Sequence, residues 1–187
     1  MRIIAGYAKG RQIKSIPGLS TRPLLEKVRG AIFNILRNEI MEKEILDLYS
    51  GTGSIGLEAL SRGAKSIIFI DNNLVCVQTI QENLKNLGFA DYATVYKNDI
   101  EKALAIIARK EFKFDIIFID PPYLKNLCEM NLKLVEKINI LRNSGIIVIH
   151  HHKKEILPEK FKNIYLSDKR KYGDAIISMY SIKSSSP

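Results

Sequence analysis

The sequence predicts a doubly wound α/β fold in a single domain, residues 1–187, with a mostly parallel sheet of seven strands. Short apolar runs alternate with segments of helical periodicity from residue 45 onward, which is the pattern of a parallel sheet with helices on both faces. Phe114–Ile119 is a nearly continuous apolar run, typical of a central strand that is covered on both sides. A glycine-rich turn at 51–56 joins a predicted strand to a predicted helix. A chain of 187 residues is long enough to bury such a core without disulfides or metals.

Each element follows from the local pattern of apolar residues and turn residues. Residues 1–20 are expected to form a small appendage, a β-hairpin of Ile3–Ala5 and Gln12–Lys14. Apolar residues at helical spacing predict a helix over 22–41. The expected strands lie at 45–48, 66–70, 93–96, 114–119, 145–149, 163–166 and 175–182, with one late strand antiparallel. One helix is expected to follow the glycine turn and to end near residue 62. Three further helices are expected over 74–87, 100–107 and 130–138.

The charge balance favours a polyanionic partner. Lysine and arginine number 29 against 20 acidic residues, which gives a net charge of +9, and basic residues gather near both ends of the chain. A composition biased toward lysine would give the same balance without such a partner. Cys76 and Cys128 form no ligand pattern, and no apolar run has the length of a membrane span or a signal sequence. We therefore expect a cytoplasmic protein without membrane contact.

Gly51-Thr52-Gly53-Ser54-Ile55-Gly56 matches G-x-G-x-x-G after a predicted strand and before a predicted helix. Asp71 lies 20 residues after Gly51, at the end of the next predicted strand. In a dinucleotide site the glycines admit a pyrophosphate and the acid binds ribose hydroxyls. Taken alone, the motif does not choose between NAD and S-adenosylmethionine.

Asp47 favours S-adenosylmethionine, because a carboxylate beside the turn suits a cofactor that carries an ammonium and a sulfonium group. The same carboxylate would repel a pyrophosphate. The segment from Asp47 to Gly53 therefore looks like the D-x-x-x-G-x-G element of class I methyltransferases. Asp71 is expected to accept both ribose hydroxyls and Asn98-Asp99 to meet the adenine, although Asn98-Asp99 would also serve as a helix N-cap. The candidate cofactor residues are Asp47, Tyr49, Ser50, Gly51, Thr52, Gly53, Asp71, Asn72, Asn98 and Asp99.

Asp120-Pro121-Pro122-Tyr123 directly follows the predicted fourth strand. The exocyclic amine of a base is a poor nucleophile, because its lone pair is delocalised into the ring. The Asp120 carboxylate and the Pro121 carbonyl could hold the amine N–H bonds in place, the prolines would stiffen the loop, and Tyr123 could stack on the base. An ordinary turn also uses Asp and Pro, but the full motif at this place favours catalysis. The candidate catalytic residues are Asp120, Pro121 and Tyr123.

The order of these motifs resembles the RsmD-type family, the 16S ribosomal RNA guanine-N2 methyltransferases of bacteria. The resemblance rests on Arg2–Gly6, Gly10-Arg11, Arg22-Pro23, Val28-Arg29, Phe33-Asn34, Asp47–Gly63 and Asp120–Tyr123. It implies a Rossmann-like class I fold, S-adenosylmethionine as the cofactor, and one guanine of small-subunit ribosomal RNA as the target. It further implies a partly assembled 30S particle as the partner. The implied RNA-binding residues, in the N-terminal hairpin and the segment after it, are Arg2, Arg11, Arg22 and Arg29.

The chain departs from the family pattern at three places. Leu24-Leu25 stand where hydroxyl residues are usual, Gly30 replaces an acid, and His150-His151-His152 stands where an acid is common. Neighbouring residues of a strand point to opposite sides, so the three histidines are not expected to bind one metal ion. We expect them to form a solvated strand end and the protein to hold no metal.

Three alternatives remain at this point. An N6-adenine methyltransferase would use the same Asp-Pro-Pro-Tyr motif but leaves Arg2–Gly6 unexplained. An NAD-dependent oxidoreductase is supported by the glycine turn alone. A non-catalytic RNA-binding assembly factor would have no need of Asp47, Asp71 and the Asp-Pro-Pro-Tyr motif. The sequence carries no signal for an oligomer, and we expect a monomer.

Overall fold

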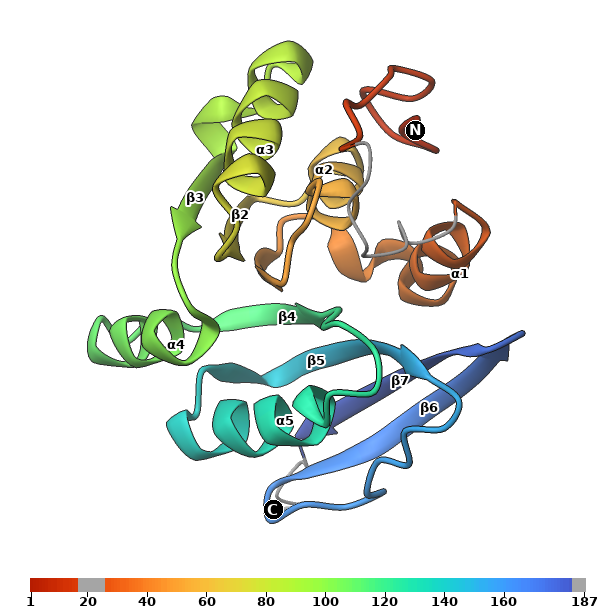
Figure 1. Ribbon diagram of the computed structural model, residues 1–187, viewed down its shortest axis with the longest axis vertical. Coiled ribbons are helices and arrows are strands. Elements are labelled where there is room, and N and C mark those ends of the chain that lie inside the picture. Colours follow the sequence, from red (N-terminus) through yellow and green to blue (C-terminus); the bar gives the residue numbers. More distant parts are fainter. Residues whose placement is uncertain (17–25, 183–187) are drawn as a thin grey trace. The chain divides into compact units, whose positions relative to one another are not determined.

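The computed structural model describes residues 1–16 and 26–182 (Figure 1). The chain forms two compact units, Met1–Ile100 and Glu101–Pro187. The number of domains stays a prediction. Arg22 and Leu24-Leu25 lie outside the described residues.

The first unit holds three parallel strands in the order β3-β2-β1. Its elements are α1 (Glu26–Leu36), the 3-10 helix η1 (Arg37–Ile40), β1 (Glu44–Leu48), α2 (Ser54–Ser61), β2 (Ser66–Asp71), α3 (Leu74–Leu87), the 3-10 helix η2 (Ala90–Tyr92) and β3 (Ala93–Lys97). Leu48 pairs with Ile70, and Asp71 pairs with Lys97. The strands therefore end at the same edge, where the glycine turn and the loop after β3 also begin.

The helix predicted over 22–41 consists of two helices within the described residues. Its α-helical part ends at Leu36, and a short 3-10 helix continues to Ile40. Arg37 has a φ of 44°, which an α-helix does not allow, so the helix stops there. The apolar face was predicted correctly, because Val28, Ile32 and Leu36 are buried.

The N-terminal segment forms a tight antiparallel turn with one bridge pair, Arg2 and Gln12, in place of two extended strands. The Ile3 amide donates to the Arg11 carbonyl at 3.0 Å, and the Gly10 amide donates to the Ile3 carbonyl at 2.9 Å. The predicted hairpin is thus present in its shortest form.

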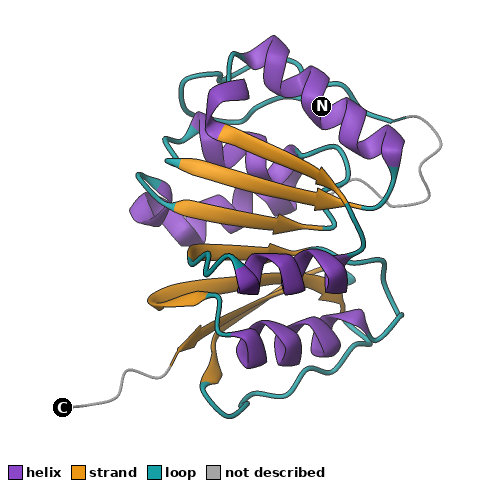
Figure 2. Cartoon of the chain, turned by 90° about the vertical axis from the view of Figure 1, so that its left-hand side faces the viewer, coloured by secondary structure: helices purple, strands orange, loops and turns teal. Residues whose placement is uncertain are grey.

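The second unit holds the strand order β4-β5-β7-β6. Its elements are α4 (Ile100–Arg109, which begins at the last residue of the first unit), β4 (Phe114–Ile119), α5 (Leu127–Ile138), β5 (Leu141–His152), β6 (Ile164–Tyr172) and β7 (Ala175–Ile182). β4 and β5 are parallel, whereas β7 is antiparallel to both β5 and β6. The strand directions can be followed in Figure 2.

The observed strands confirm the predicted fold class. There are seven of them in the described residues, in the orders 3-2-1 and 4-5-7-6 with β7 antiparallel, as in class I methyltransferases. Ile116–Ile119 of β4 are buried, as expected of a central strand. β5 is longer than predicted at both ends, because Leu141 pairs with Phe114 of β4 and because β5 pairs with β7 as far as His152, opposite Ala175.

Candidate functional site

The turn after β1 is fixed to the end of β2 by Ser50. The Ser50 hydroxyl lies 2.7 Å from the carbonyl oxygen of Asp47 and 3.1 Å from that of Ile70. The Ile70 amide donates to the same hydroxyl at 3.0 Å. The turn is therefore held in place before any ligand binds, and Tyr49 enters it with a φ of 61°.

Two glycines of the turn are required by its geometry. Gly53 has a φ of 76°, a conformation that side chains rarely adopt, and it directly precedes α2. A Cβ atom at Gly56 would lie 2.2 Å from the Phe69 ring, so only glycine lets α2 pack this closely on β2. The motif thus places the N-terminus of a helix beside a rigid turn.

Asp71 is oriented by two backbone amides. Its Oδ2 accepts from the Gly51 amide at 2.8 Å, and its Oδ1 accepts from the Asn73 amide at 2.9 Å. The carboxylate is half-buried. A carboxylate offers about four lone-pair sites, so it can accept further donors besides the two amides. Burial, followed by the charge of Asp71, raises the pKa of the Cys76 thiol to about 11.

The remaining candidate cofactor residues occupy the same edge of the first unit. The Asn98 amide donates to the Asp71 carbonyl at 3.1 Å, and the Asn98 side chain accepts from the Asp99 amide at 2.9 Å. Asn72 and Asp99 are exposed, Thr52 is half-buried, and Asp47 is buried at the end of β1. The structure therefore brings the turn, Asp71 and Asn98 together, while the Asp47 carboxylate lies in the interior.

This arrangement suits a nucleoside cofactor without a phosphate. A half-buried carboxylate with two fixed oxygens can accept the two neighbouring hydroxyls of a ribose. A pyrophosphate at the glycine turn would lie near the buried Asp47 carboxylate and would meet like charge. The residues present therefore fit S-adenosylmethionine better than a dinucleotide.

The second unit contains a hydrogen-bonded group of three side chains, of which sequence reasoning predicted Asp120 and Tyr123 but missed His150. His150, near the end of β5, places its Nδ1 2.7 Å from Oδ1 of Asp120 and its Nε2 2.8 Å from the Tyr123 hydroxyl. The Tyr123 ring centroid lies 5.4 Å from that of His150 and 5.5 Å from that of His152. Pro121 is buried in the same loop. Asp120 and Tyr123 are thus brought together, with a histidine between them.

The prediction of a solvated strand end at His150–His152 is wrong. His150 and His151 are buried because β5 continues to His152 and pairs there with β7. The His151 Nε2 lies 2.9 Å from the Ser178 hydroxyl, and burial lowers the pKa of His151. β4 and β5 run parallel with Ile119 opposite Ile149, so Asp120, just after β4, and His150, still within β5, lie side by side.

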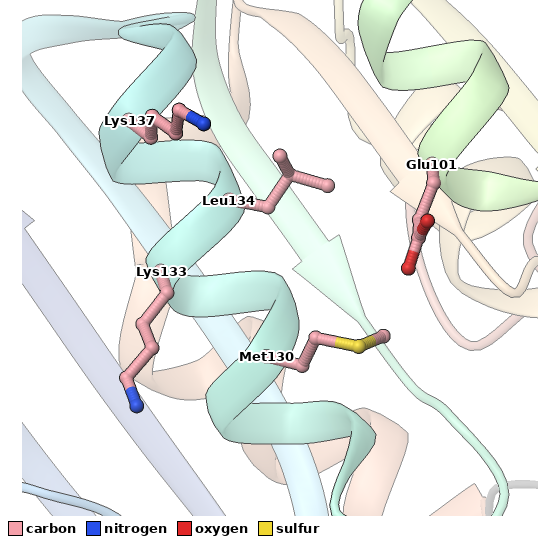
Figure 3. Close-up of a pocket in the computed structure, with 5 residues that line it drawn as sticks. All are labelled: Glu101, Met130, Lys133, Leu134 and Lys137. Atoms are coloured by element: carbon pink, nitrogen blue, oxygen red, sulfur yellow. The ribbon is translucent and has the colours of Figure 1, made fainter.

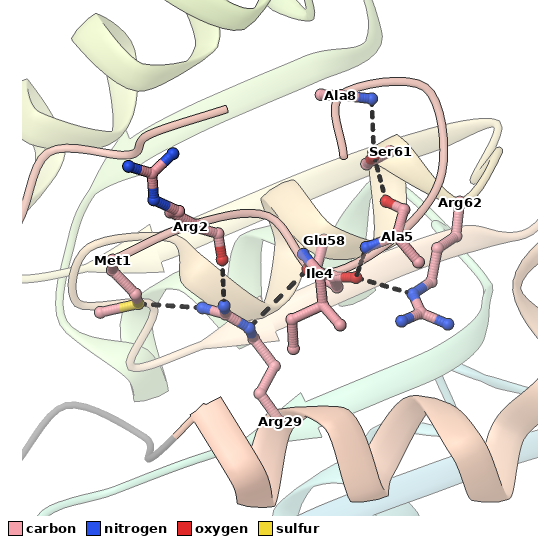
Figure 4. A network of polar contacts seen from close by, with 9 residues as sticks. All are labelled: Met1, Arg2, Ile4, Ala5, Ala8, Arg29, Glu58, Ser61 and Arg62. Atoms are coloured by element: carbon pink, nitrogen blue, oxygen red, sulfur yellow. Dashed lines mark hydrogen bonds and ion pairs between the residues drawn. The ribbon is translucent and has the colours of Figure 1, made fainter. Parts of the chain in front are cut away.

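The prediction that Arg29 binds RNA is also wrong, because its side chain is fully buried. Figure 4 shows the guanidinium directed at Glu58 of α2, with Nε 3.8 Å from Oε2, and at the Arg2 carbonyl. Burial lowers the pKa of Arg29, and the Glu58 charge opposes this. Glu58 also accepts from the Ile4 and Ala5 amides and from Arg62. Arg29 therefore attaches the N-terminal segment to the unit.

Arg2 and Arg11 remain exposed at the N-terminal turn. Arg2 donates to the Gly10 carbonyl at 3.0 Å. Arg11 donates to the Leu87 carbonyl at 3.3 Å and to the Asn86 carbonyl, so it caps the C-terminus of α3. Both guanidinium groups have further donors that could reach a phosphate.

A pocket elsewhere in the second unit contains none of the predicted site residues. Figure 3 shows it along α5, facing Glu101 of α4. Its lining residues are Glu101, Met130, Lys133, Leu134 and Lys137. Among residues 1–16 and 26–182, no helix is long and apolar enough to cross a membrane, and no group of three or more His, Cys, Asp or Glu side chains could hold a metal ion.

Solved structures with the same fold define the class of the protein. The chain superposes on "Putative methyltransferase yhhF from Escherichia coli" with a TM-score of 0.85 and 28% identity, over 98% of both chains. It superposes on the hypothetical protein TTHA0928 of Thermus thermophilus with a TM-score of 0.85 and 26% identity, over 97% of this chain and 99% of the other. The fold and the two motifs define a class I methyltransferase, the class that uses S-adenosylmethionine.

The family profile described as "Conserved hypothetical protein 95" matches residues 1–181, and the chain belongs to this family. It is 39% identical to "Putative rRNA methyltransferase YlbH" of Bacillus subtilis over 96% of this chain and 98% of that protein. It is 31% identical to "Ribosomal RNA small subunit methyltransferase D" of Escherichia coli K12 over 96% of this chain and 89% of that protein. The resemblance to the RsmD-type family is confirmed.

Proposed function

We propose that the protein transfers a methyl group from S-adenosylmethionine to the N2 amine of one guanine in small-subunit ribosomal RNA. The observation that carries this proposal is the Asp120 carboxylate, held by His150 at one oxygen and followed by two prolines and Tyr123. The name of the Escherichia coli relative supports small-subunit RNA as the substrate. A ribosomal substrate in turn favours a cytoplasmic enzyme and a partly assembled 30S particle as the partner.

The first unit is proposed to bind the cofactor, which supplies an electrophilic methyl group when bound. Asp71 would accept the ribose hydroxyls, Asn72 would lie beside it, and Asn98-Asp99 would meet the adenine. The turn from Tyr49 to Gly53 would approach the amino acid part. The buried Asp47 would favour the positive charge of the cofactor through its field.

The second unit is proposed to bind the reacting base. The free lone pairs of Asp120 and the carbonyl of Pro121 would accept the N–H bonds of the guanine amine. Both acceptors would then stabilise the positive charge that develops on the nitrogen as it attacks the methyl carbon. Tyr123 would stack on the base, and the rigid prolines keep the acceptors directed at the amine.

The substrate class is tested by methyl transfer to matched RNA samples. The assay compares unmethylated small-subunit particles and unmethylated naked small-subunit RNA with large-subunit RNA. Each sample is incubated with the protein and labelled S-adenosylmethionine. We expect incorporation into the small-subunit samples, and into particles at the higher rate. Equal labelling of large-subunit RNA would contradict the proposed substrate.

Asp71→Ala is expected to weaken S-adenosylmethionine binding by about 10- to 100-fold, equal to about 1.4–2.8 kcal/mol. The substitution removes a charged acceptor of two hydroxyl groups and releases the Gly51 amide. Isothermal titration calorimetry measures the dissociation constant. Asp91→Ala, which removes an exposed carboxylate of the same unit, serves as the control and should bind normally. Unchanged affinity in Asp71→Ala would remove Asp71 from the cofactor site.

RNA binding is expected to depend less steeply on salt in the double variant Arg2→Ala, Arg11→Ala. Each phosphate that is neutralised on single-stranded RNA contributes about −0.7 to the slope of log K against log salt concentration, so the slope should flatten by about 1.4. The control is Lys65→Ala, Lys133→Ala, which removes the same charge from two lysines already paired with Glu44 and Glu129. Equal slopes for both double variants would show that Arg2 and Arg11 make no specific contact.

A further inference from the structure

We infer that His150 is a positioning residue that holds Asp120 and Tyr123 as one unit and so fixes where the reacting amine must lie. The inference rests on the proposed function, because it assigns a role in the same site. It starts from three side chains on two segments: Asp120 and Tyr123 from the loop after β4, and His150 from β5.

The backbone places these groups together. β4 and β5 are parallel neighbours with Ile119 opposite Ile149, so the next residues, Asp120 and His150, lie at the same edge. The His150 side chain is 9% exposed and the Asp120 side chain 26% exposed, so water competes weakly for their 2.7 Å contact. A short contact between partly buried groups restricts the carboxylate to one orientation.

The chemistry of the acceptor fixes the proton on the ring. An ionised carboxylate only accepts, so the Nδ1 atom that faces Asp120 carries the hydrogen. In the neutral ring Nε2 is then an acceptor, and the Tyr123 hydroxyl donates to it. The Tyr123 hydroxyl therefore donates to His150, and His150 donates to Asp120.

This order leaves one oxygen of Asp120 for the substrate. His150 engages Oδ1, so Oδ2 is the oxygen that we assign to the substrate amine. The same imidazole holds the Tyr123 hydroxyl, so the stacking ring and the carboxylate move together. A loss of His150 would release both, and a misplacement of about 1 Å in such a site can cost on the order of 100-fold in rate.

Amide variants separate the two bonds of His150. The amide nitrogen of Asn lies near the position of Nδ1 and can still donate to Asp120, whereas the longer Gln places its amide group near Nε2 and can still contact Tyr123. The control is Ser178→Ala, which removes the matching 2.9 Å bond of the neighbouring buried His151. Thermal unfolding of every variant identifies any that fail to fold.

We expect His150→Ala to lower kcat by about 10- to 100-fold, with an unchanged KM for S-adenosylmethionine. His150→Asn should recover most of the loss, His150→Gln less, and Ser178→Ala should keep the wild-type kcat. Methyl transfer to unmodified small-subunit particles measures these values. A folded His150→Ala protein with wild-type kcat, or a His150→Gln protein faster than His150→Asn, would overturn the inference.

A second measurement needs no activity and so separates this inference from the proposed function. In protein labelled with ¹⁵N-histidine, we expect the His150 ring as a single Nδ1–H tautomer. Asp120→Asn should change its Nδ1 shift and Tyr123→Phe its Nε2 shift, while the His151 signals stay in place. A ring that exchanges between both tautomers in the wild type would overturn the inference, even if the protein methylates RNA. Wild-type protein that shows the fixed tautomer but labels no ribosomal RNA would contradict only the proposed function.

Discussion

Glu58→Gln is expected to lower the free energy of unfolding by about 3–5 kcal/mol, because it removes one partner of a buried ion pair. The side chains of Glu58 and Arg29 are both 0% exposed. The substitution keeps the shape of the side chain but leaves the Arg29 guanidinium without its counter-charge. It also weakens the bonds from the Ile4 and Ala5 amides, which attach the N-terminal segment to α2.

Urea denaturation measures this loss, and amide hydrogen exchange locates it. Exchange at Ile4 and Ala5 should accelerate in Glu58→Gln. The control is Glu82→Gln, which removes an exposed ion pair with Lys14 and should cost at most about 1 kcal/mol. Similar losses in both variants would show that the buried pair contributes no more than a surface pair.

Asp120→Ala is expected to lower kcat for RNA methylation by about 100-fold or more, since one oriented acceptor at a developing charge is worth about 3 kcal/mol. S-adenosylmethionine affinity should stay nearly unchanged, because the proposed cofactor residues all precede residue 100. Asp120→Asn keeps an acceptor oxygen without the charge, so an intermediate rate is expected.

Single-turnover methyl transfer, with cofactor affinity measured separately, checks both parts of this expectation. The control is Asp174→Ala, which removes a carboxylate that is 65% exposed and pairs with Lys153. It should methylate at the wild-type rate. An Asp120→Ala protein that does the same would refute the proposed role of the carboxylate.

The sequence was sufficient to predict the strands and the turn, because their signals are local. An apolar run bounded by turn residues, such as Phe114–Ile119, and the glycines before Ser54 indicate their structure from the neighbouring residues alone. Asp71 was predicted for the same reason, since it directly ends β2. The candidate cofactor residues thus followed from their spacing and from the charge of Asp47, and their binding role stays a proposal.

Arg29 and His150 could not be predicted by the same reasoning, because their partners are distant in sequence. Arg29 was counted with the basic residues, yet it shares the buried face of α1 with Ile32 and Phe33. Its environment depends on Glu58, which is brought to it by the fold. His150 depends on strand pairing, because β7 extends β5 beyond the apolar run that predicted it. The burial of His150 therefore depends on which strands pair, and the periodicity of apolar residues does not predict strand pairing.

The most direct test of the central claim is the identity of the methylated nucleoside. Unmodified small-subunit particles are incubated with the protein and S-adenosylmethionine that carries a labelled methyl group, and the RNA is digested and separated by mass spectrometry. The proposed function predicts that the label appears in N2-methylguanosine and is lost with Asp120→Ala. Label in N6-methyladenosine, or label in N2-methylguanosine that Asp120→Ala leaves unchanged, would contradict it.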